Sequence, residues 1–145
     1  MIAEAIVCLA LNAYHEARDQ DIRGMIAVSQ VVMNRVESRH FPDKVCDVVY
    51  QGHHRKSWAD PNKRIPIKNR CQFSWYCDGK SDEPIDKMAW ETSLLIASGV
   101  LNNSVDNLVG DSLWYHADYV EPDWASEKRE YVVIGNHIFY EKKDS

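Results

Sequence analysis

The chain has 145 residues, of which 45% are hydrophobic and 27% charged, and its formal net charge is −5. This length and composition predict one globular domain, residues 1–145, with a core large enough to fold without disulfides or metals. The longest apolar stretch is interrupted by Glu4 and Asn12. It is too short to span a bilayer, and it lacks the basic flank and the cleavage site of a signal peptide.

The first 50 residues are predicted to be helical. Residues 2–17 are apolar almost all round, which favours a helix in the middle of the domain. Residues 21–38 form a second helix with one apolar face, and residues 44–50 a short third helix. The residues of the first helix expected to face the core are Ile2, Ile6, Leu9, Ala10 and Ala13.

The charge is concentrated in residues 51–70, a segment expected to be a long loop. It holds six basic residues and one acidic residue, a local charge of +5, so the remainder of the chain carries −10. A basic segment on an acidic body indicates local contact with an anionic partner, although a solvated loop would give the same pattern. The acidic body argues against nucleic acid as the main partner.

The rest of the chain mixes short strands with one helix. Residues 71–77 and 112–117 are predicted strands, and residues 131–140 are two more, joined by a Gly135-Asn136 turn. Residues 85–100 form the last helix. Met88, Ala89, Leu95 and Ile96 are expected to face the core there. The predicted fold class is α+β, mostly α, with a small antiparallel sheet.

Four cysteines are present: Cys8, Cys46, Cys71 and Cys77. Cys8 lies inside the apolar first helix and is expected to behave as a small core residue. The other three allow one disulfide with one thiol left over, or no disulfide. The absence of a CxxC pair argues against a structural zinc site.

Glu16 is the candidate catalytic residue. It lies near the end of the apolar first helix, which would carry its carboxylate to the edge of the core. Lost hydration there would raise the pKa of the carboxyl group and let it hold a proton near neutral pH, as a general acid must. The competing interpretation is an ordinary solvated glutamate at a helix end.

The second half of the chain is rich in aromatic residues, with eleven from Phe73 onwards, most of them on predicted strands or loops. Aromatic rings with polar tips suit a half-wet groove, and sugars offer flat C–H faces to stack on such rings. Each ring taken singly is explained as well by a place in the core. The cluster therefore indicates a sugar-binding cleft only in combination with other signals.

Other chemistries find less support. Residues 15–19 differ from the HExxH zinc pattern because the fifth position is Asp19, and no two histidines stand at i, i+4. Ser74 and Ser112 lack a nucleophile-elbow context, and there is no glycine-rich phosphate loop. No metal and no cofactor are therefore expected.

Several blocks stand out in order along the chain. They are residues 13–18, 24–36, 41–51 and 72–74, Trp90, and residues 115–117, 122–124 and 134–140. Together these blocks resemble the SleB-type cell-wall hydrolase family, which comprises the spore-cortex-lytic enzymes and related phage endolysins of the lysozyme-like superfamily. The resemblance covers nearly the whole chain, and its blocks are specific only in combination.

The resemblance implies a lysozyme-like fold of the lytic transglycosylase type. It implies cleavage of the peptidoglycan glycan strand at the MurNAc–GlcNAc β-1,4 bond, with Glu16 as catalytic acid and base. It further implies a cleft lined by Gln72, Ser74, Trp75, Tyr115, His116, His137 and Tyr140.

One departure from the family pattern bears on the mechanism. The family commonly reads Glu-Ala-Arg-Gly-Glu where this chain reads Glu16-Ala17-Arg18-Asp19-Gln20, so the second carboxylate is replaced by an amide. Ordinary glycosidases need two carboxyl groups at set separations. The departure favours a transglycosylase with one glutamate over a muramidase, unless Asp19 or Asp21 replaces the missing group.

Two further alternatives remain open at this stage: a metal-dependent wall amidase that uses the histidines, and a binding module that has lost catalysis. The expected partner is peptidoglycan, with no nucleic acid and no membrane, and the protein is expected to be a monomer. It would act on the cell wall, in the periplasm or outside the cell. A phage lysis enzyme is the first expectation, and the isolated catalytic domain of a bacterial enzyme the second.

Overall fold

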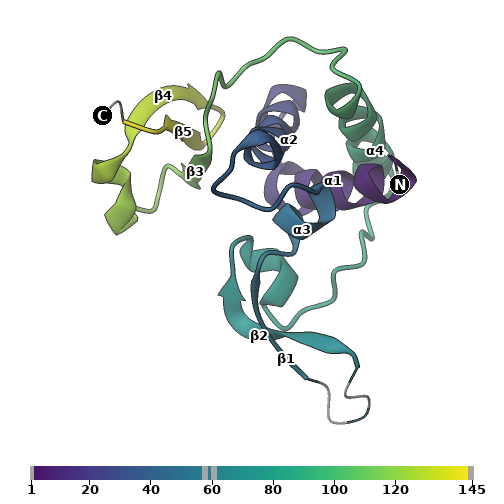
Figure 1. The fold of residues 1–145 in the computed structure, drawn as a ribbon. Coiled ribbons are helices and arrows are strands. Elements are labelled where there is room, and N and C mark those ends of the chain that lie inside the picture. Colours follow the sequence, from purple (N-terminus) through teal and green to yellow (C-terminus); the bar gives the residue numbers. More distant parts are fainter. Residues whose placement is uncertain (1, 57–58, 60–61, 144–145) are drawn as a thin grey trace.

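The fold is built around one central helix, α1 (Ile2–Ala17), as predicted. The computed structural model describes residues 2–56, 59 and 62–143, and for His53, Arg55 and Lys56 the backbone only. Helix α1 contacts the three other α-helices (Figure 1). Leu9, Ala10 and Ala13 on α1 have no exposed surface. The surrounding helices are α2 (Ile22–Glu37), α3 (Val45–Val49) and α4 (Lys87–Leu101).

A three-stranded antiparallel sheet lies to one side of the helices, and a β-hairpin projects from them next to α3 (Figure 1). The central strand of the sheet is the last strand in the chain, which pairs with both others. The strands of the sheet are β3 (Trp114–Ala117), β4 (Arg129–Ile134) and β5 (His137–Glu141), with a 3₁₀ helix, η2 (Asp123–Glu127), before β4.

The basic segment is the largest departure from the prediction. In place of a loop over residues 51–70, strands β1 (Gly52–Lys56) and β2 (Arg64–Cys71) form an antiparallel hairpin. The residues of β1 are all polar, charged or glycine, and β2 has only Ile65 and Ile67 as an apolar pair, so hydropathy gave too weak a strand signal. Residues 57–58 and 60–61 of the basic segment lie outside the described part of the chain.

The strand predicted for residues 71–77 is wrong, because Ser74–Cys77 form a 3₁₀ helix, η1. A disulfide joins Cys71 to Cys77, with 6.0 Å between their Cα atoms. Six residues of extended strand would separate those atoms by about 20 Å. The disulfide and an extended strand therefore exclude each other.

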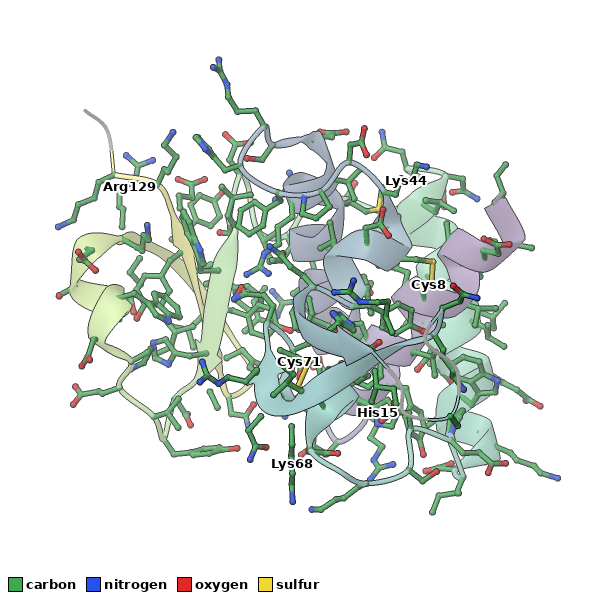
Figure 2. The ribbon with its side chains drawn as sticks, turned by 60° about the horizontal axis from the view of Figure 1, so that its bottom comes forward. Cys8, His15, Lys44, Lys68, Cys71 and Arg129 are labelled. Atoms are coloured by element: carbon green, nitrogen blue, oxygen red, sulfur yellow. A yellow bond between two sulfur atoms is a disulfide. The ribbon has the colours of Figure 1, made fainter. Side chains whose placement is uncertain are left out.

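The second disulfide, Cys8–Cys46, ties α1 to α3 (Figure 2). The sequence predicted Cys8 to be a simple core residue. It is buried in the core as expected, but it is also cross-linked, so all four cysteines are paired. The pairing depends on α3 folding back on α1, which no local pattern reveals.

Helix α4 packs only in part through the face that was predicted. Ile96 is buried as expected and Ala89 is partly buried, but Met88 and Leu95 are 81% and 76% exposed, and on α1 Ile2 is 74% exposed. The buried face of α4 includes Ser93 and Ala97, small residues that let two helices approach closely. None of the described helices is long and apolar enough to cross a membrane.

Helix α2 holds the segment that leads into the sheet. Asn34 Nδ2 donates hydrogen bonds to the carbonyl oxygens of Gly110 and Ser112, at 3.0 and 2.9 Å. Arg35 Nε donates to the carbonyl oxygen of Leu113 at 2.7 Å. These bonds fix the chain immediately before β3, and so they set where β3 places its side chains.

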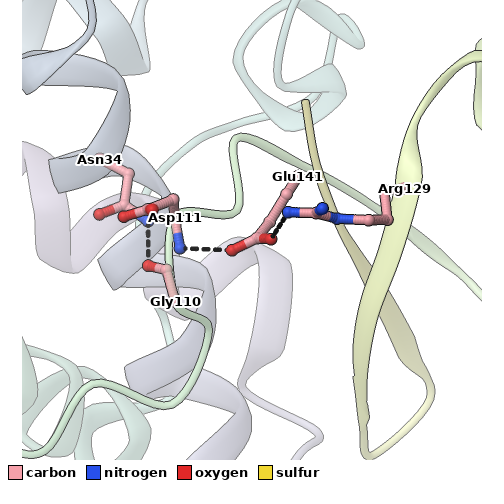
Figure 3. Close-up of polar contacts among 5 residues, drawn as sticks. All are labelled: Asn34, Gly110, Asp111, Arg129 and Glu141. Carbon is pink, nitrogen blue, oxygen red and sulfur yellow. Dashed lines mark hydrogen bonds and ion pairs between the residues drawn. The ribbon is translucent and has the colours of Figure 1, made fainter. Parts of the chain in front are cut away.

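The same segment is tied to the far edge of the sheet (Figure 3). The Asp111 N–H donates to Glu141 Oε2 at 2.9 Å, and Arg129 forms a salt bridge with Glu141 Oε1 at 2.7 Å. Glu141 is buried at the end of β5 and receives a hydrogen bond on each oxygen. The sheet is thus fastened to the helices by polar contacts as well as by apolar packing.

The two disulfides should differ in how much they stabilise the fold. Cys8–Cys46 spans 38 residues and Cys71–Cys77 spans 6. Loop-closure entropy predicts that replacing both cysteines of the long loop by serine lowers the free energy of unfolding by about 4 kcal/mol, and of the short loop by about 2 kcal/mol. Urea unfolding of the two double variants tests this order, and equal or reversed losses would contradict it.

Candidate active site

Glu16 lies in the last turn of α1, partly exposed, where α1 faces the sheet. The hydroxyl of Tyr115 on β3 donates a short hydrogen bond to Glu16 Oε1. Burial raises the pKa of the Glu16 carboxyl, while the Tyr115 hydrogen bond and the charge of Arg35 act to lower it. The net effect is a raised pKa, which is the condition that the sequence predicted for a general acid.

Tyr115 is held as a hydrogen-bond donor. Burial raises its pKa well above the ordinary value, and the charge of Glu16 and the hydrogen bond to it raise it further. The phenol therefore stays protonated. Because it occupies Oε1, the Oε2 atom of Glu16 is the oxygen left to exchange a proton with another molecule.

Arg35 is the site residue that the sequence analysis missed. It is 4% exposed, and its guanidinium lies over the rings of Phe41 and Phe73, at 4.6 and 5.2 Å from their centres. Burial lowers its pKa to about 10, against the opposing influence of Tyr115 and Glu16. Arg35 is therefore charged at neutral pH.

A signal for Arg35 was present in the helical pattern. It stands three residues after Val32 and seven after Val28, on the apolar face of α2. Charged residues are rarely buried without a partner. An arginine in a stripe of valines therefore indicates a buried interaction, here with the Leu113 carbonyl and with the charge of Glu16.

His137, on β5, packs against Tyr115. The ring centres are 5.3 Å apart in an edge-to-face arrangement, and His137 is 8% exposed. Burial lowers the pKa of His137, and His116 lowers it further, although Asp19 and Asp118 act in the opposite direction. A neutral imidazole at this position is a hydrogen-bonding group. Within the described part of the chain, its Nδ1 atom has no partner.

His116 and Tyr140 form a second polar pair on the sheet. His116 Nε2 lies 2.8 Å from the Tyr140 hydroxyl, and the two rings stack with centres 5.2 Å apart. The ring of Trp124 contacts both, at 5.6 and 5.4 Å. The sequence grouped His116 and Tyr140 in one cleft, and the structure brings them together.

The segment after the hairpin supports the site from the other side. Phe73 stacks on Tyr115 with ring centres 6.3 Å apart. Its neighbours Gln72 and Ser74 are exposed. They are the chain neighbours of a ring that touches Tyr115.

Trp75 differs from the role expected for it. It is 6% exposed, its Nε1 donates to Asn12 Oδ1 at 2.9 Å, and its ring stacks on His15 at 4.7 Å. A ring packed in this way supports α1 beside Glu16 and has little surface for a ligand. Tyr140, at 8% exposed, is similarly covered apart from its bond to His116.

The candidates for a second carboxylate have other partners. Asp21 caps α2 by accepting the Gly24 N–H at 3.1 Å. The amide at Gln20 accepts the Asn136 N–H at 3.2 Å, in the turn between β4 and β5. Asp19 is exposed and acts on the charge of His137. None of these groups is among the main influences on the Glu16 pKa.

Neither a metal-binding group of residues nor the large cavity marks the position of the site around Glu16. Among the described residues, no three histidine, cysteine or acidic side chains gather as a metal-binding group. A cavity of about 900 Å³ opens between the start of α1, α3 and the end of α4. That is the opposite end of α1 from Glu16, so the site is defined by its chemistry.

The comparison with known families assigns the chain to a class. The sequence model of the family described as Cell Wall Hydrolase matches residues 19–140, and the chain belongs to this family. The matched range begins after Glu16, so it does not itself bear on that residue.

Two curated relatives carry the name spore cortex-lytic enzyme. The protein of Halalkalibacterium halodurans is 27% identical over 134 residues, which is 92% of this chain and 34% of the relative. The protein of Oceanobacillus iheyensis is 25% identical over 142 residues, covering 92% of this chain and 40% of the relative. The chain thus spans about a third to two fifths of the length of these relatives.

Two solved structures share the fold. The catalytic domain of the germination-specific lytic transglycosylase SleB from Bacillus anthracis has a TM-score of 0.66 at 24% identity, over 94% of this chain and 93% of that one. The catalytic domain of SleB from Bacillus cereus has a TM-score of 0.62 at 24% identity, over 95% and 91%. The predicted α+β, mostly helical fold with a small antiparallel sheet is confirmed, and it is the fold of these two catalytic domains.

Replacing Tyr115 by phenylalanine should raise the pKa of Glu16. The hydroxyl bonds to the carboxylate, so its loss removes a contact that favours the ionised form. An NMR titration of the Glu16 side-chain carboxyl measures the shift. Tyr119→Phe is the matched control, because Tyr119 is 80% exposed and should leave the pKa unchanged. A pKa that falls in Tyr115→Phe would contradict the assigned role.

Glu16→Gln should stabilise the fold at neutral pH. The folded-state pKa of Glu16 is raised above 4.5, so its ionisation favours the unfolded chain. Stability is therefore lost as the pH rises from about 4.5 through the folded pKa. The variant should melt higher than wild type at pH 7, and the difference should vanish near pH 4. Thermal melting across this range is the measurement, and a lower melting temperature at pH 7 would refute the premise.

Proposed function

We propose that this protein cleaves peptidoglycan glycan strands at the MurNAc–GlcNAc β-1,4 bond as a lytic transglycosylase, with Glu16 as its only catalytic carboxylate. The observation that carries the proposal is the state of Glu16. Its carboxyl is partly buried with a raised pKa, held on one oxygen by Tyr115, with its other oxygen free of protein partners among the described residues. The family description and the names of the relatives agree with a substrate in the cell wall.

The first step uses Glu16 as an acid. Its protonated Oε2 donates to the glycosidic oxygen, and the bond between that oxygen and C1 of MurNAc breaks. Burial of the carboxyl favours the protonated form that begins this step. The GlcNAc fragment leaves with the proton.

The second step uses Glu16 as a base. The ionised carboxylate takes the proton of the MurNAc 6-hydroxyl while that oxygen bonds to C1, which gives a 1,6-anhydro end and restores protonated Glu16. The Tyr115 hydrogen bond and the charge of Arg35 both favour the ionised form that this step requires. Glu16, Tyr115 and Arg35 thus act in both steps, the one that needs a protonated carboxyl and the one that needs an ionised carboxylate.

Muramidase activity is the second candidate. Hydrolysis of the ordinary kind requires a second carboxyl about 5 to 9.5 Å from the first. Gln20 and Asp21 are occupied in the turn and the helix cap, which favours the transglycosylase. One observation favours hydrolysis. Asp19 is close enough for its charge to act on His137, and the His137 ring contacts that of Tyr115.

The remaining site residues are proposed to bind the glycan. The exposed amide of Gln72 and hydroxyl of Ser74 suit hydrogen bonds to sugar hydroxyl and N-acetyl groups. His116 and His137 would contribute ring nitrogens from the sheet. Trp75 and Tyr140 would support the site indirectly, because Trp75 stacks on His15 and Tyr140 stacks on His116.

The proposed setting is the cell wall. We infer a monomer whose partner is peptidoglycan, with no nucleic acid or membrane partner, acting in the periplasm or outside the cell. Release of a phage-encoded enzyme at lysis is the first proposal for how it reaches the wall. Light scattering of the purified chain, and fractionation of producing cells, test these points separately.

Digestion of purified peptidoglycan should release anhydro-muropeptides. After borohydride reduction these are about 20 Da lighter than the reduced products of hydrolysis, because they lack one water and the two hydrogens that reduction adds. Glu16→Gln should lower the rate by on the order of 10²- to 10⁴-fold while the protein stays folded. Mass spectrometry reads the product, and turbidity loss reads the rate.

Three results of this experiment would count against the proposal. Reducible ends in place of anhydro ends would favour the muramidase. Loss of activity with a chelator would point to a metal-dependent amidase. Equal clearing by wild type and Glu16→Gln would show that Glu16 is not catalytic.

A further inference from the structure

We propose that a second pocket, formed by Asp47, Tyr50, His54 and Arg64, binds the zwitterionic peptide stem that the glycan strand carries. The pocket has a volume of about 350 Å³ and lies where the end of α3 meets the hairpin. The inference rests on the proposed function, because it takes the peptide to be attached to the same substrate. It adds a peptide site to the glycan site around Glu16.

Aromatic contacts hold the walls of this pocket. The rings of Tyr50 and Tyr76 lie 4.6 Å apart, and His54 packs on Tyr76 at 5.9 Å. His54 Nδ1 lies 3.1 Å from the Gly52 carbonyl oxygen, to which it donates, and Nε2 lies 3.3 Å from the Tyr76 hydroxyl. These contacts join strand β1 to η1 and to the end of α3, so the pocket lies where these three elements meet.

The charges of the pocket are opposite and unpaired. Asp47 and Arg64 are both exposed. Neither takes part in a salt bridge among the described residues, where the ion pair found is Arg129–Glu141. A free carboxylate and a free guanidinium in one pocket are complementary to a ligand that carries an ammonium and a carboxylate. Peptidoglycan stems carry both groups where they contain a diamino acid.

The pocket lies close to the site around Glu16, with the buried Trp75 between them. His15, next to Glu16, stacks on Trp75 at 4.7 Å, and the Trp75 ring is 6.3 Å from that of Tyr50. The His15 and Tyr50 ring centres are therefore no more than about 11 Å apart. A stem of four residues extends about 13 Å, at roughly 3.3 Å per residue. A stem attached to a sugar near Glu16 can therefore reach the pocket.

The binding test uses the full chain with Glu16→Gln, titrated with the free tetrapeptide L-Ala-γ-D-Glu-diaminopimelate-D-Ala and followed by NMR. Arg64→Gln and Asp47→Asn should each weaken binding by about three- to tenfold, because each removes one charged contact with the peptide. Lys68→Gln is the matched control, since it removes an exposed cation from β2 outside the pocket and should change the affinity less than twofold.

Equal weakening by Lys68→Gln would overturn the pocket in favour of general charge attraction. Absence of peptide binding to the parent chain would also overturn it. Melting temperatures of the three variants, which all change exposed side chains, show that each is folded.

A second measurement separates this inference from the proposed function. Glycan strands stripped of peptide should be cleaved equally well by wild type, Arg64→Gln and Asp47→Asn, whereas intact peptidoglycan should show a raised KM for the two variants. If stripped strands are cleaved in a Glu16-dependent way but the peptide does not bind, the peptide site is refuted and the proposed function stands. Peptide binding with no Glu16-dependent cleavage would remove the function and leave a peptide-binding protein.

Discussion

The hydrogen bond between Tyr115 and Glu16 is the contact on which the site depends. It joins residues 99 positions apart, one at the end of the central helix and one on the first strand of the sheet. It exists because Asn34 and Arg35 fasten the chain just before β3 to helix α2. The orientation of the proposed acid is therefore set by how the sheet docks on the helices.

The chemistry of Glu16 follows from opposing influences on one carboxyl group. Burial favours its protonated form, while the phenol of Tyr115 and the guanidinium of Arg35 favour its ionised form. A group that must give a proton and then take one back needs both states within reach. Arg35 contributes through its charge while Phe41 and Phe73 cover its planar face. The buried guanidinium thus acts on the pKa of Glu16 through its charge, while aromatic rings cover the guanidinium itself.

The helices and the sheet strands were largely predictable, because their signals are local. The three long helices follow the 3.6-residue period, and β5 follows the Gly135-Asn136 turn, where Gly135 has φ 59° and a Cβ would collide with Gln20. The hairpin and the 3₁₀ helix were not predictable. The hairpin strands are mostly polar, and residues 71–77 alternate like a strand although a disulfide closes them into a turn.

The sequence by itself determined the long helices, the family resemblance, and Glu16 as a carboxyl at the end of an apolar helix. It also showed that Gln20 replaces a carboxylate. Tertiary structure alone decided the partners of Glu16, the cysteine pairing, and that Trp75 supports the site from within the core. The physical reason is that a pKa, a disulfide and a burial state depend on neighbours brought from distant parts of the chain, and a local sequence pattern carries no record of them.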